Sequence, residues 1–266
     1  MVSIEIKKIS DSLKMVRIGV INYFKVSDSI LFDAGTSCTA RKLIESGEAG
    51  EIEAVIVSHA HFDHITGIKE LKKLEIEFFL HRDAEKILSK EKVVEIWNKE
   101  DDEFCRKSGL SHSSDLYIRP QPESRLKEVA ETKNFEIIEI PGHSPDSIAL
   151  FHPEERYILV ADSLGFPLSD GNLPMYFYSF REYIRSIEKI KSLEPVKLCL
   201  GHDGVVTDIS YCDTAIQSAL KLKEEIENGL DEGEIFRKVY RESLTLYPLE
   251  TLKGVVKLLI KRSLEK

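Results

Sequence analysis

The residues best suited to chemistry lie in one short segment, VIVSHAHFDHITG, at positions 55–67. His59 and His61 follow an apolar run, and residues two apart in an extended segment point the same way, so both rings can converge on one point. If a helix starts near His64, its free N–H groups and dipole favour an ionised Asp63. The spacing therefore predicts a site for two adjacent metal ions.

Three more candidate ligands each follow an apolar strand directly. His143 lies in IPGHSPDS, Asp162 in LVADS and His202 in CLGHDG, and each loop contains small residues or proline that shape a tight turn. Five histidines and two carboxylates form a nitrogen- and oxygen-rich site for zinc, iron or manganese. The remaining histidines are assigned to the scaffold: His81, near the start of a helix, His112 and His152.

The elements that must position these ligands alternate between strands and helices. The predicted strands are rich in β-branched and aromatic residues: VRIGVINYFKV, SILFDAG, IEAVIVS, IEFFLH, FEIIEI, SIALFH, RYILVAD and KLCLGHDG. The nearly continuous apolar run IEAVIVS is typical of a strand that is covered on both faces. TARKLIESG, RDAEKILSK and FREYIRSIEKIKSL are predicted helices.

The chain is expected to divide near Thr207. Residues 1–206 carry all the strand signals and form the predicted catalytic domain, while 207–266 contain three helical patterns and form a predicted C-terminal helical subdomain. Within the predicted catalytic domain, the insert at 91–131 has a looser, charged pattern with a proline-containing turn. Such an insert is typical of a lid or wall over a site.

Composition narrows the class of protein. The 266 residues are 42% hydrophobic, enough for a substantial α/β core, and the net charge of −9 argues against nucleic acid as a partner. No apolar run approaches the length of a membrane span, and the segment MVSIEIKKISDSLKM lacks the apolar core that a signal peptide needs. The four cysteines form no metal-binding pattern and are expected to be free thiols in the cytoplasm. A small-molecule substrate is expected, and no pattern specifies an oligomeric state.

The motifs together resemble those of a known family. HAHFDH is similar to the HxHxDH signature of the metallo-β-lactamase superfamily, and PGHSPDS, ADS and GHDG resemble its downstream ligand motifs in the same order. LFDAGT resembles the early strand and loop whose aspartate, here Asp33, supports the site. The similarity spans about residues 14–206. It implies an αββα sandwich, two mixed sheets flanked by helices, with metals at one edge.

The resemblance also implies how the ligands divide between two metals. By this resemblance, the first metal would be held by His59, His61 and His143. The second would be held by Asp63, His64 and His202, and Asp162 would bridge the two metals. An aspartate bridge places the chain nearer the glyoxalase-II-like and lactonase-like hydrolases than the dizinc β-lactamases, which use a cysteine in the second site. The helical tail resembles the extension in that group, although Gly165 stands where the lactonases have a tyrosine.

The predicted chemistry is hydrolysis. Two cations, most readily zinc, would share a water, lower its pKa and supply a hydroxide that attacks an acyl carbon. Asp63 is the predicted catalytic residue, because it can orient this nucleophile and take its proton. The expected substrate is an ester, thioester or lactone. Tyr176, Phe177 and Tyr178 are candidates for a substrate wall, with core packing as the alternative.

Other functions fit the same ligands. A persulfide-dioxygenase-like oxidoreductase would use a single iron with this ligand set. A nuclease of the same superfamily is disfavoured by the net acidity and by the lack of an evident basic arm. A scaffold without catalysis is disfavoured because all seven ligands are present.

Overall fold

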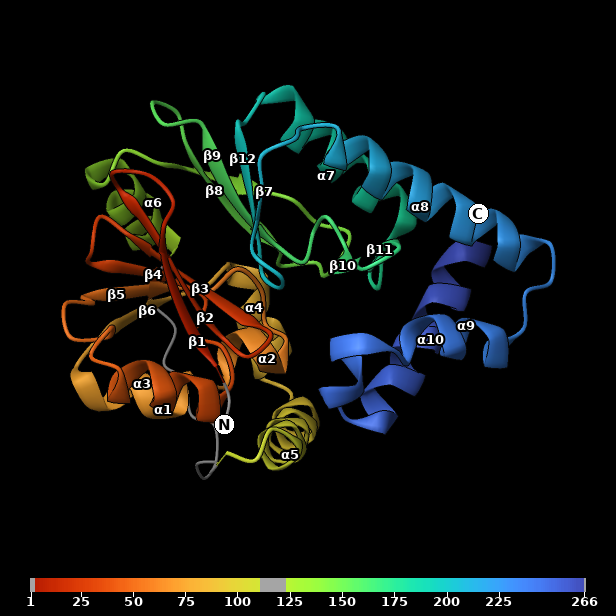
Figure 1. Cartoon of the computed structure of the whole chain (residues 1–266), viewed down its shortest axis with the longest axis horizontal. Coiled ribbons are helices and arrows are strands. Elements are labelled where there is room, and N and C mark those ends of the chain that lie inside the picture. Colours follow the sequence, from red (N-terminus) through yellow and green to blue (C-terminus); the bar gives the residue numbers. More distant parts are fainter. Residues whose placement is uncertain (1–2, 111–122, 266) are drawn as a thin grey trace.

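Two mixed β-sheets packed face to face form the core of the protein (Figure 1). The computed structural model describes residues 3–110 and 123–265. The six-stranded sheet runs in order β1 (Ile4–Lys8), β2 (Leu13–Ile18), β3 (Ile21–Val26), β4 (Ile30–Phe32), β5 (Ala54–Ile56) and β6 (Glu77–Phe79). The five-stranded sheet runs in order β13 (Val205–Val206), β12 (Lys197–Leu200), β9 (Tyr157–Ala161), β8 (Ile148–His152) and β7 (Glu136–Glu139).

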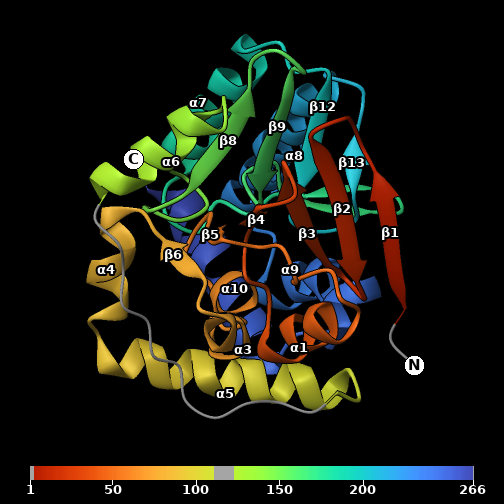
Figure 2. The same ribbon diagram turned by 90° about the vertical axis from the view of Figure 1, so that its left-hand side faces the viewer.

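Helices cover the outer faces of both sheets (Figures 1 and 2). The N-terminal helices are α1 (Ser37–Glu45), α2 (Phe62–Ile65), α3 (Ile68–Leu71), the 3-10 helix η1 (Lys72–Leu74), α4 (Arg82–Leu88), α5 (Glu91–Lys107) and α6 (Glu123–Thr132). The later ones are α7 (Phe180–Ser192), α8 (Tyr211–Glu227), α9 (Glu232–Val239), η2 (Glu242–Leu246) and α10 (Leu249–Leu264). Helices α1 and α3 flank the six-stranded sheet, and α7 flanks the five-stranded sheet. The predicted αββα sandwich is confirmed.

Alternate residues of the central strands face two different cores. In β5, Ala54 and Ile56 belong to the core between the sheets, whereas Val55 packs in the core beneath the helices. In β9, Leu159 and Val160 divide in the same way. Because both faces are covered, these strands read as continuous apolar runs in the sequence.

The structure divides one predicted strand between two and adds others. VRIGVINYFKV is not one strand: it forms most of the hairpin β2–β3, whose turn contains Gly19 at a φ of 62°, a conformation that glycine adopts without strain. The small hairpin of β10 (Phe166–Leu168) and β11 (Gly171–Leu173) and the exposed edge strand β1 are additional to the prediction.

The three helices expected in the tail are confirmed as α8, α9 and α10. They lie to one side of the sandwich (Figure 1), and α10 reaches back to it: Ser263 Oγ lies 2.9 Å from the hydroxyl of Tyr176. The insert at 91–131 begins with one long helix, α5, and ends in α6. Its residues 111–122, including His112, lie outside the described part of the chain.

The expectation that all cysteines are free thiols is wrong for two of them. Cys38 of α1 and Cys105 of α5, separated by 67 residues in sequence, form a disulfide, while Cys199 and Cys212 are free and buried. The two bonded residues meet because α1 and α5 pack side by side. The argument for a reducing compartment therefore loses its basis.

The same helix pair is held by a buried polar network. Asp101 of α5 accepts hydrogen bonds from the backbone N–H of Ser37, at 2.9 Å, and from the hydroxyl of Thr66, at 2.6 Å. Lys69 Nζ lies 2.9 Å from the same carboxylate in a fully buried ion pair. Helix α5 is thereby fixed against the loop and helices that follow β4 and β5.

None of the helices within residues 3–110 and 123–265 has both the length and the apolar character needed to cross a bilayer.

Candidate metal centre

The seven predicted ligands meet at one end of the sandwich, each at the end of a strand or in the short helix α2. His59 and His61 follow β5, and α2 begins one residue after His61. Asp63 and His64 lie in α2. The remaining three follow strands of the second sheet: His143 after β7, Asp162 after β9 and His202 after β12. Six of the seven side chains are buried, and His61 is partly exposed. Strand ends from both sheets therefore supply one compact cluster.

Three histidine rings converge on one point. His59 Nε2 lies 3.0 Å from His61 Nδ1 and 3.1 Å from His143 Nε2, and His61 Nδ1 lies 2.9 Å from His143 Nε2. Hydrogen bonds alone cannot satisfy three mutually close imidazole nitrogens, because each neutral ring has only one N–H. A cation at their centre would accept all three lone pairs.

A second set lies beside the first and shares Asp162 with it. Asp162 Oδ1 is 3.4 Å from His64 Nε2 and 3.3 Å from His202 Nε2, whereas Oδ2 is 3.6 Å from His143 Nε2. Asp63 Oδ2 lies 3.5 Å from His202 Nε2. The two oxygens of Asp162 thus face two different groups of nitrogen ligands.

Contacts behind the rings fix their orientation. The Nδ1 atoms of His143 and His202 donate to the carbonyl oxygens of Met175, at 2.8 Å, and Val20, at 3.0 Å. His64 Nδ1 lies 2.9 Å from Asp33 Oδ2. Each of these rings therefore presents Nε2 to the centre, the arrangement in which an outer hydrogen bond sets the tautomer of a metal-binding histidine.

Asp33 and Gly201 support the centre from outside. The second oxygen of Asp33 accepts the N–H of Ser58 at 2.7 Å, which ties the strand end that carries His59 to the aspartate that orients His64. A Cβ at Gly201 would lie 2.8 Å from Asp162 Oδ1 and 2.9 Å from His64 Cε1. Only glycine leaves room for these two ligands to approach the chain.

The protonation of the cluster follows from burial and charge. Burial, together with the neighbouring His61, lowers the pKa of His143 to about 3, and burial lowers the pKa of His59 well below its usual range. Burial also opposes charge at His202, but the Asp162 carboxylate outweighs it and raises the pKa of His202 to about 10. The first set is therefore neutral and rich in lone pairs, while the second holds carboxylates that attract positive charge.

Two further observations indicate that the seven proposed ligands can hold divalent cations. His64 Nε2 and Asp162 Oδ1 are buried and have no hydrogen-bond partner among the described residues, a costly state that a metal ion would relieve. Three overlapping groups of side chains offer ligand atoms that lie within 4.8 Å of one another. Imidazole and carboxylate donors suit zinc, iron or manganese.

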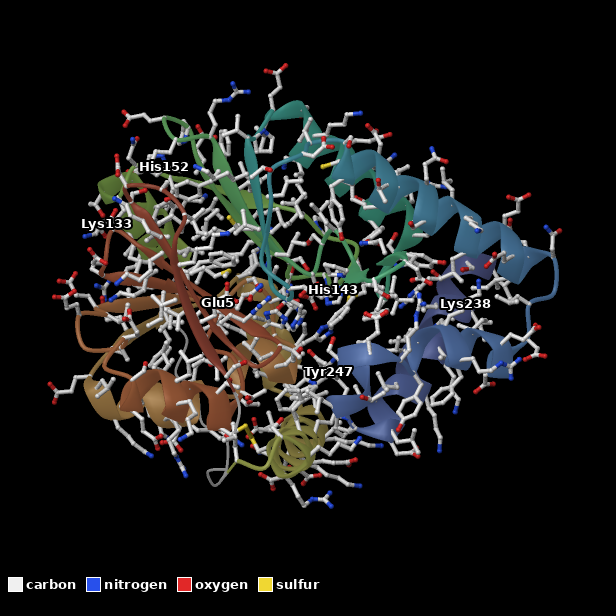
Figure 3. All side chains as sticks on the ribbon, viewed as in Figure 1. Glu5, Lys133, His143, His152, Lys238 and Tyr247 are labelled. Carbon is white, nitrogen blue, oxygen red and sulfur yellow. A yellow bond between two sulfur atoms is a disulfide. The ribbon has the colours of Figure 1, made fainter. Side chains whose placement is uncertain are left out.

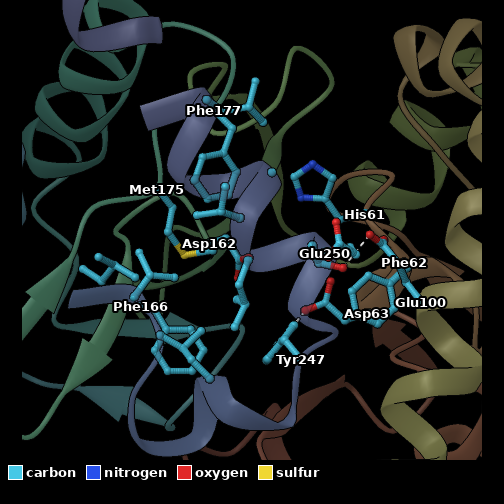
Figure 4. Close-up of a pocket in the computed structure, with 18 of the residues that line it drawn as sticks. His61, Phe62, Asp63, Glu100, Asp162, Phe166, Met175, Phe177, Tyr247 and Glu250 are labelled. Atoms are coloured by element: carbon cyan, nitrogen blue, oxygen red, sulfur yellow. Dashed lines mark hydrogen bonds between the residues drawn. The ribbon is translucent and has the colours of Figure 1, made fainter. Parts of the chain in front are cut away.

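A cavity of about 260 Å³ opens onto this centre (Figure 4). His61, Asp63 and Asp162 form its floor. The walls are mostly apolar: Phe166 and Leu173 from the β10–β11 hairpin, Met175 and Phe177 from the segment after it, Trp97 from α5, and Leu244, Val255 and Leu258 from the tail.

The three aromatic residues predicted as a substrate wall have different surroundings. Phe177 lines the cavity and lies 5.0 Å from the ring of His143. Tyr176 is buried, and its hydroxyl is directed to Ser263 of α10. Tyr178 is 43% exposed and lies outside the cavity lining.

Sequence reasoning missed Tyr247, which stands between η2 and α10. Its hydroxyl donates to Asp63 Oδ2 at 2.8 Å and lies 3.4 Å from His202 Nε2. Figure 3 shows Tyr247 of the tail and His143 of the second sheet both where the sandwich meets the helical tail. Glu100 of α5 also lines the cavity and was missed. No local pattern marks either residue, since each reaches the site through the packing of its helix.

The histidines assigned to the scaffold lie apart from the described ligand groups. His81 caps α4 and accepts the N–H of Asp83 at 3.2 Å, as its position near a helix start predicted. His152 ends β8 and accepts the N–H of Glu155 at 3.2 Å.

Comparison with known proteins agrees with this architecture. The profile of the metallo-beta-lactamase superfamily matches residues 18–202. The Beta-lactamase-like protein 2 homolog of Caenorhabditis elegans is 25% identical over 231 residues, 84% of this chain and 69% of that protein. The Probable metallo-hydrolase YflN of Bacillus subtilis is 28% identical over 223 residues, 73% of this chain and 82% of that protein. An archaeal metallo-beta-lactamase superfamily protein from Sulfolobus tokodaii superposes with a TM-score of 0.57 at 15% identity, covering 93% of each chain. The profile match, together with the ligand motifs and the two-sheet sandwich of this chain, shows that the chain belongs to the metallo-β-lactamase superfamily.

Proposed function

We propose that this enzyme is a dinuclear metal-dependent hydrolase that cleaves an ester, thioester or lactone. The observation that carries the proposal is the pair of ligand sets that share Asp162, whose two oxygens face different groups of histidine nitrogens. The metallo-hydrolase name of the Bacillus subtilis relative supports hydrolysis as the reaction class.

The ligands divide as the two sets suggest. One cation would be held by His59, His61 and His143, the other by Asp63, His64 and His202, and both by Asp162. Zinc is the most readily accommodated metal for this donor set, with iron and manganese as alternatives. When bound, such cations supply Lewis acidity and a water of lowered pKa.

The protein's own residues perform the remaining tasks. Asp63 lies at the cavity floor, and burial does not prevent its ionisation, because His64 and His202 lower its pKa to about 2. As an ionised carboxylate at the cavity floor, Asp63 is the group proposed to orient an attacking water and take its proton. Tyr247 holds this carboxylate in place through its hydroxyl. The apolar walls limit the access of bulk water to the reacting carbonyl.

We further propose that residues 1–206 form the catalytic domain and that 207–266 form a helical subdomain that completes the substrate pocket. Leu244, Tyr247 and Leu258 of the tail line the same cavity as the ligands of the sandwich. Phe177 is the proposed contact for the substrate among the three aromatic residues considered.

Metal analysis combined with a substrate panel tests the proposal. The purified protein should saturate at two metal ions per chain, and His202→Ala should lose one of them. His81→Ala, which removes a histidine that caps α4 elsewhere, should keep both. The loaded enzyme should hydrolyse at least one class among acyl esters, thioesters and lactones and incorporate one solvent oxygen into the released acid.

Two results would contradict the proposal. Saturation at one ion, with His202→Ala retaining the full metal content, would exclude the dinuclear centre. A reaction that requires dioxygen and places its oxygen in a sulfur product would replace hydrolysis with the dioxygenase alternative.

A further inference from the structure

One acidic side chain in the substrate cavity has no role in the metal centre. Glu100 of α5 lines the cavity (Figure 4), and Trp97 of the same helix is also part of the lining. Its Oε1 accepts a hydrogen bond from the hydroxyl of Thr251 on α10, at 2.5 Å. Glu100 therefore lies where two helices that carry no family motif meet above the metal ligands.

Among the described residues, no lysine or arginine of the cavity lining compensates Glu100. Apart from the metal ligands, the charged residues of the described cavity lining are Glu100 and Glu250, and the lining includes no lysine or arginine. Glu250 is exposed and pairs with Lys253 at 2.7 Å, so it is balanced outside the cavity. The charges that act most on Glu100, those of Asp63 and Glu103, are negative.

An uncompensated carboxyl group in an apolar cavity is unfavourable for folding. Burial, added to the charges of Asp63 and Glu103 and only partly offset by the Thr251 hydroxyl, raises the pKa of Glu100 to about 7. Since the metal centre does not use Glu100, a ligand that brings its own positive charge would remove this cost.

We propose that Glu100 recognises a cationic group on the substrate, and that the substrate is an ester, thioester or lactone whose apolar body carries an ammonium or similar cation. This inference rests on the proposed hydrolase function and specifies its substrate class. The reactive carbonyl would lie at the cavity floor beside Asp63, and the apolar body would contact Phe177 and Met175. The cation would lie at Glu100, in a lining that also includes the aromatic residues Trp97 and Tyr247, whose rings can attract a positive charge.

The same geometry selects against anions. A substrate with a carboxylate, sulfate or phosphate on its apolar body would bring negative charge to Glu100 in an environment of low polarity, where repulsion is strong. Thioesters of strongly anionic carriers are therefore expected to be poor substrates when the carrier must occupy this cavity.

A set of three matched esters tests the inference. We would use phenyl esters of an ω-amino acid, of the unbranched alkanoic acid of equal length, and of the corresponding dicarboxylic acid esterified at one end. The metal-loaded wild-type enzyme should show the highest kcat/KM for the amino ester, by about tenfold over the neutral ester, the usual effect of one charge-assisted contact. The carboxylate ester should be the poorest substrate.

Variants of α5 assign the preference to Glu100. Glu100→Gln should lower kcat/KM for the amino ester about tenfold more than for the neutral ester, and Glu100→Lys should favour the carboxylate ester. Glu95→Gln is the matched control, because Glu95 is exposed on the same helix, and it should leave the order of the three esters unchanged. If Glu100→Gln does not fold, Thr251→Val, which removes the hydroxyl that orients Glu100, should reduce the same preference.

A binding measurement separates this inference from the proposed function. Titration calorimetry with an alkylammonium ion and with the alkanoate of equal length should show tighter binding of the ammonium ion, and Glu100→Gln should abolish the difference. If no ester is cleaved but the ammonium ion is preferred, the proposed hydrolysis of these esters fails and the recognition by Glu100 stands. Equal kcat/KM for the three esters, or equal binding of the two ions, would overturn the inference.

Discussion

The contact between Tyr247 and Asp63 gives the sharpest prediction about catalysis. Tyr247→Phe removes only the hydroxyl that donates to Asp63 Oδ2 at 2.8 Å. The ring should keep its packing, because its edge contacts with Phe62 and Phe104, at centroid distances of 5.9 and 5.4 Å, do not involve the oxygen. The substitution therefore isolates the effect of one hydrogen bond on the proposed proton acceptor.

The magnitude follows from the chemistry of the contact. A hydrogen bond to a buried charged group contributes about 1.5–3 kcal/mol, and a loss of this size in the transition state lowers kcat by about ten- to hundredfold. KM should change less, because the hydroxyl of Tyr247 is bonded to Asp63 and orients that carboxylate. The free energy of unfolding should also fall, by up to about 3 kcal/mol, because the buried Asp63 carboxylate loses its donor.

The assay compares kcat, KM and metal content in Tyr247→Phe and in a matched control. Tyr240→Phe removes a hydroxyl from another tyrosine of the tail, one that is 43% exposed and stacked on Phe236, and it should behave like the wild type. A change in kcat of less than about twofold, with two metals still bound, would refute the positioning role, since even a weak hydrogen bond exceeds that effect. A loss of activity that parallels a loss of metal would instead assign Tyr247 to metal retention.

Four other changes test the remaining parts of the argument. Asp63→Asn should lower turnover by about two to four orders of magnitude, the range expected for a positioned acid–base group, and near-normal turnover would exclude Asp63 as the proton acceptor. Asp162→Ala should lower the occupancy of both metal positions in elemental analysis, because a bridging carboxylate offsets the repulsion between two cations; loss from one position alone would exclude the bridge. The preference for the amino ester should increase as the pH rises through about 7, where Glu100, whose pKa is raised to about 7, becomes an anion; a preference that falls over this range would contradict the assignment. Replacing Cys38 and Cys105 by alanine should lower the free energy of unfolding by about 4 kcal/mol on the loop-entropy model for a separation of 67 residues, measured by denaturant titration without reductant, and an unchanged value would show that the bond adds no stability.

The residues proposed as metal ligands could be found in the sequence because local geometry determines their positions. His59 and His61 follow a strand whose apolar run is unmistakable, and their spacing of two residues is enough to direct both rings to one side. The later ligands follow strands of the same kind, so the edge of the sandwich could be inferred before its topology was known. The hairpin in VRIGVINYFKV was missed because Gly19 was the only interruption in an otherwise strand-like run.

Features that depend on long-range packing could not be predicted in this way. The spacing of Cys38 and Cys105 is set by how α1 meets α5, and no pattern of two isolated cysteines separated by 67 residues specifies a bond. Tyr247 precedes a proline in a helical tail and would be read there as a packing residue. Its hydroxyl reaches Asp63 across 184 positions of sequence only because the tail folds back over the sandwich.

The substrate pocket depends on these long-range contacts more than the metal centre does. The superfamily profile ends at residue 202, before the tail begins, and the described cavity wall comes partly from α5 and α10. Lys107 at the end of α5 donates to the backbone oxygen of Tyr247 at 2.6 Å, and Thr251 donates to Glu100, so the two helices are bonded to each other at the pocket. The positions of Tyr247 and Glu100 therefore depend on how these helices dock, whereas the seven proposed ligands lie on strand ends and in α2. It follows that relatives with the same ligands can differ in substrate, and that the substrate of this enzyme is to be sought through the charge and shape of α5 and the tail.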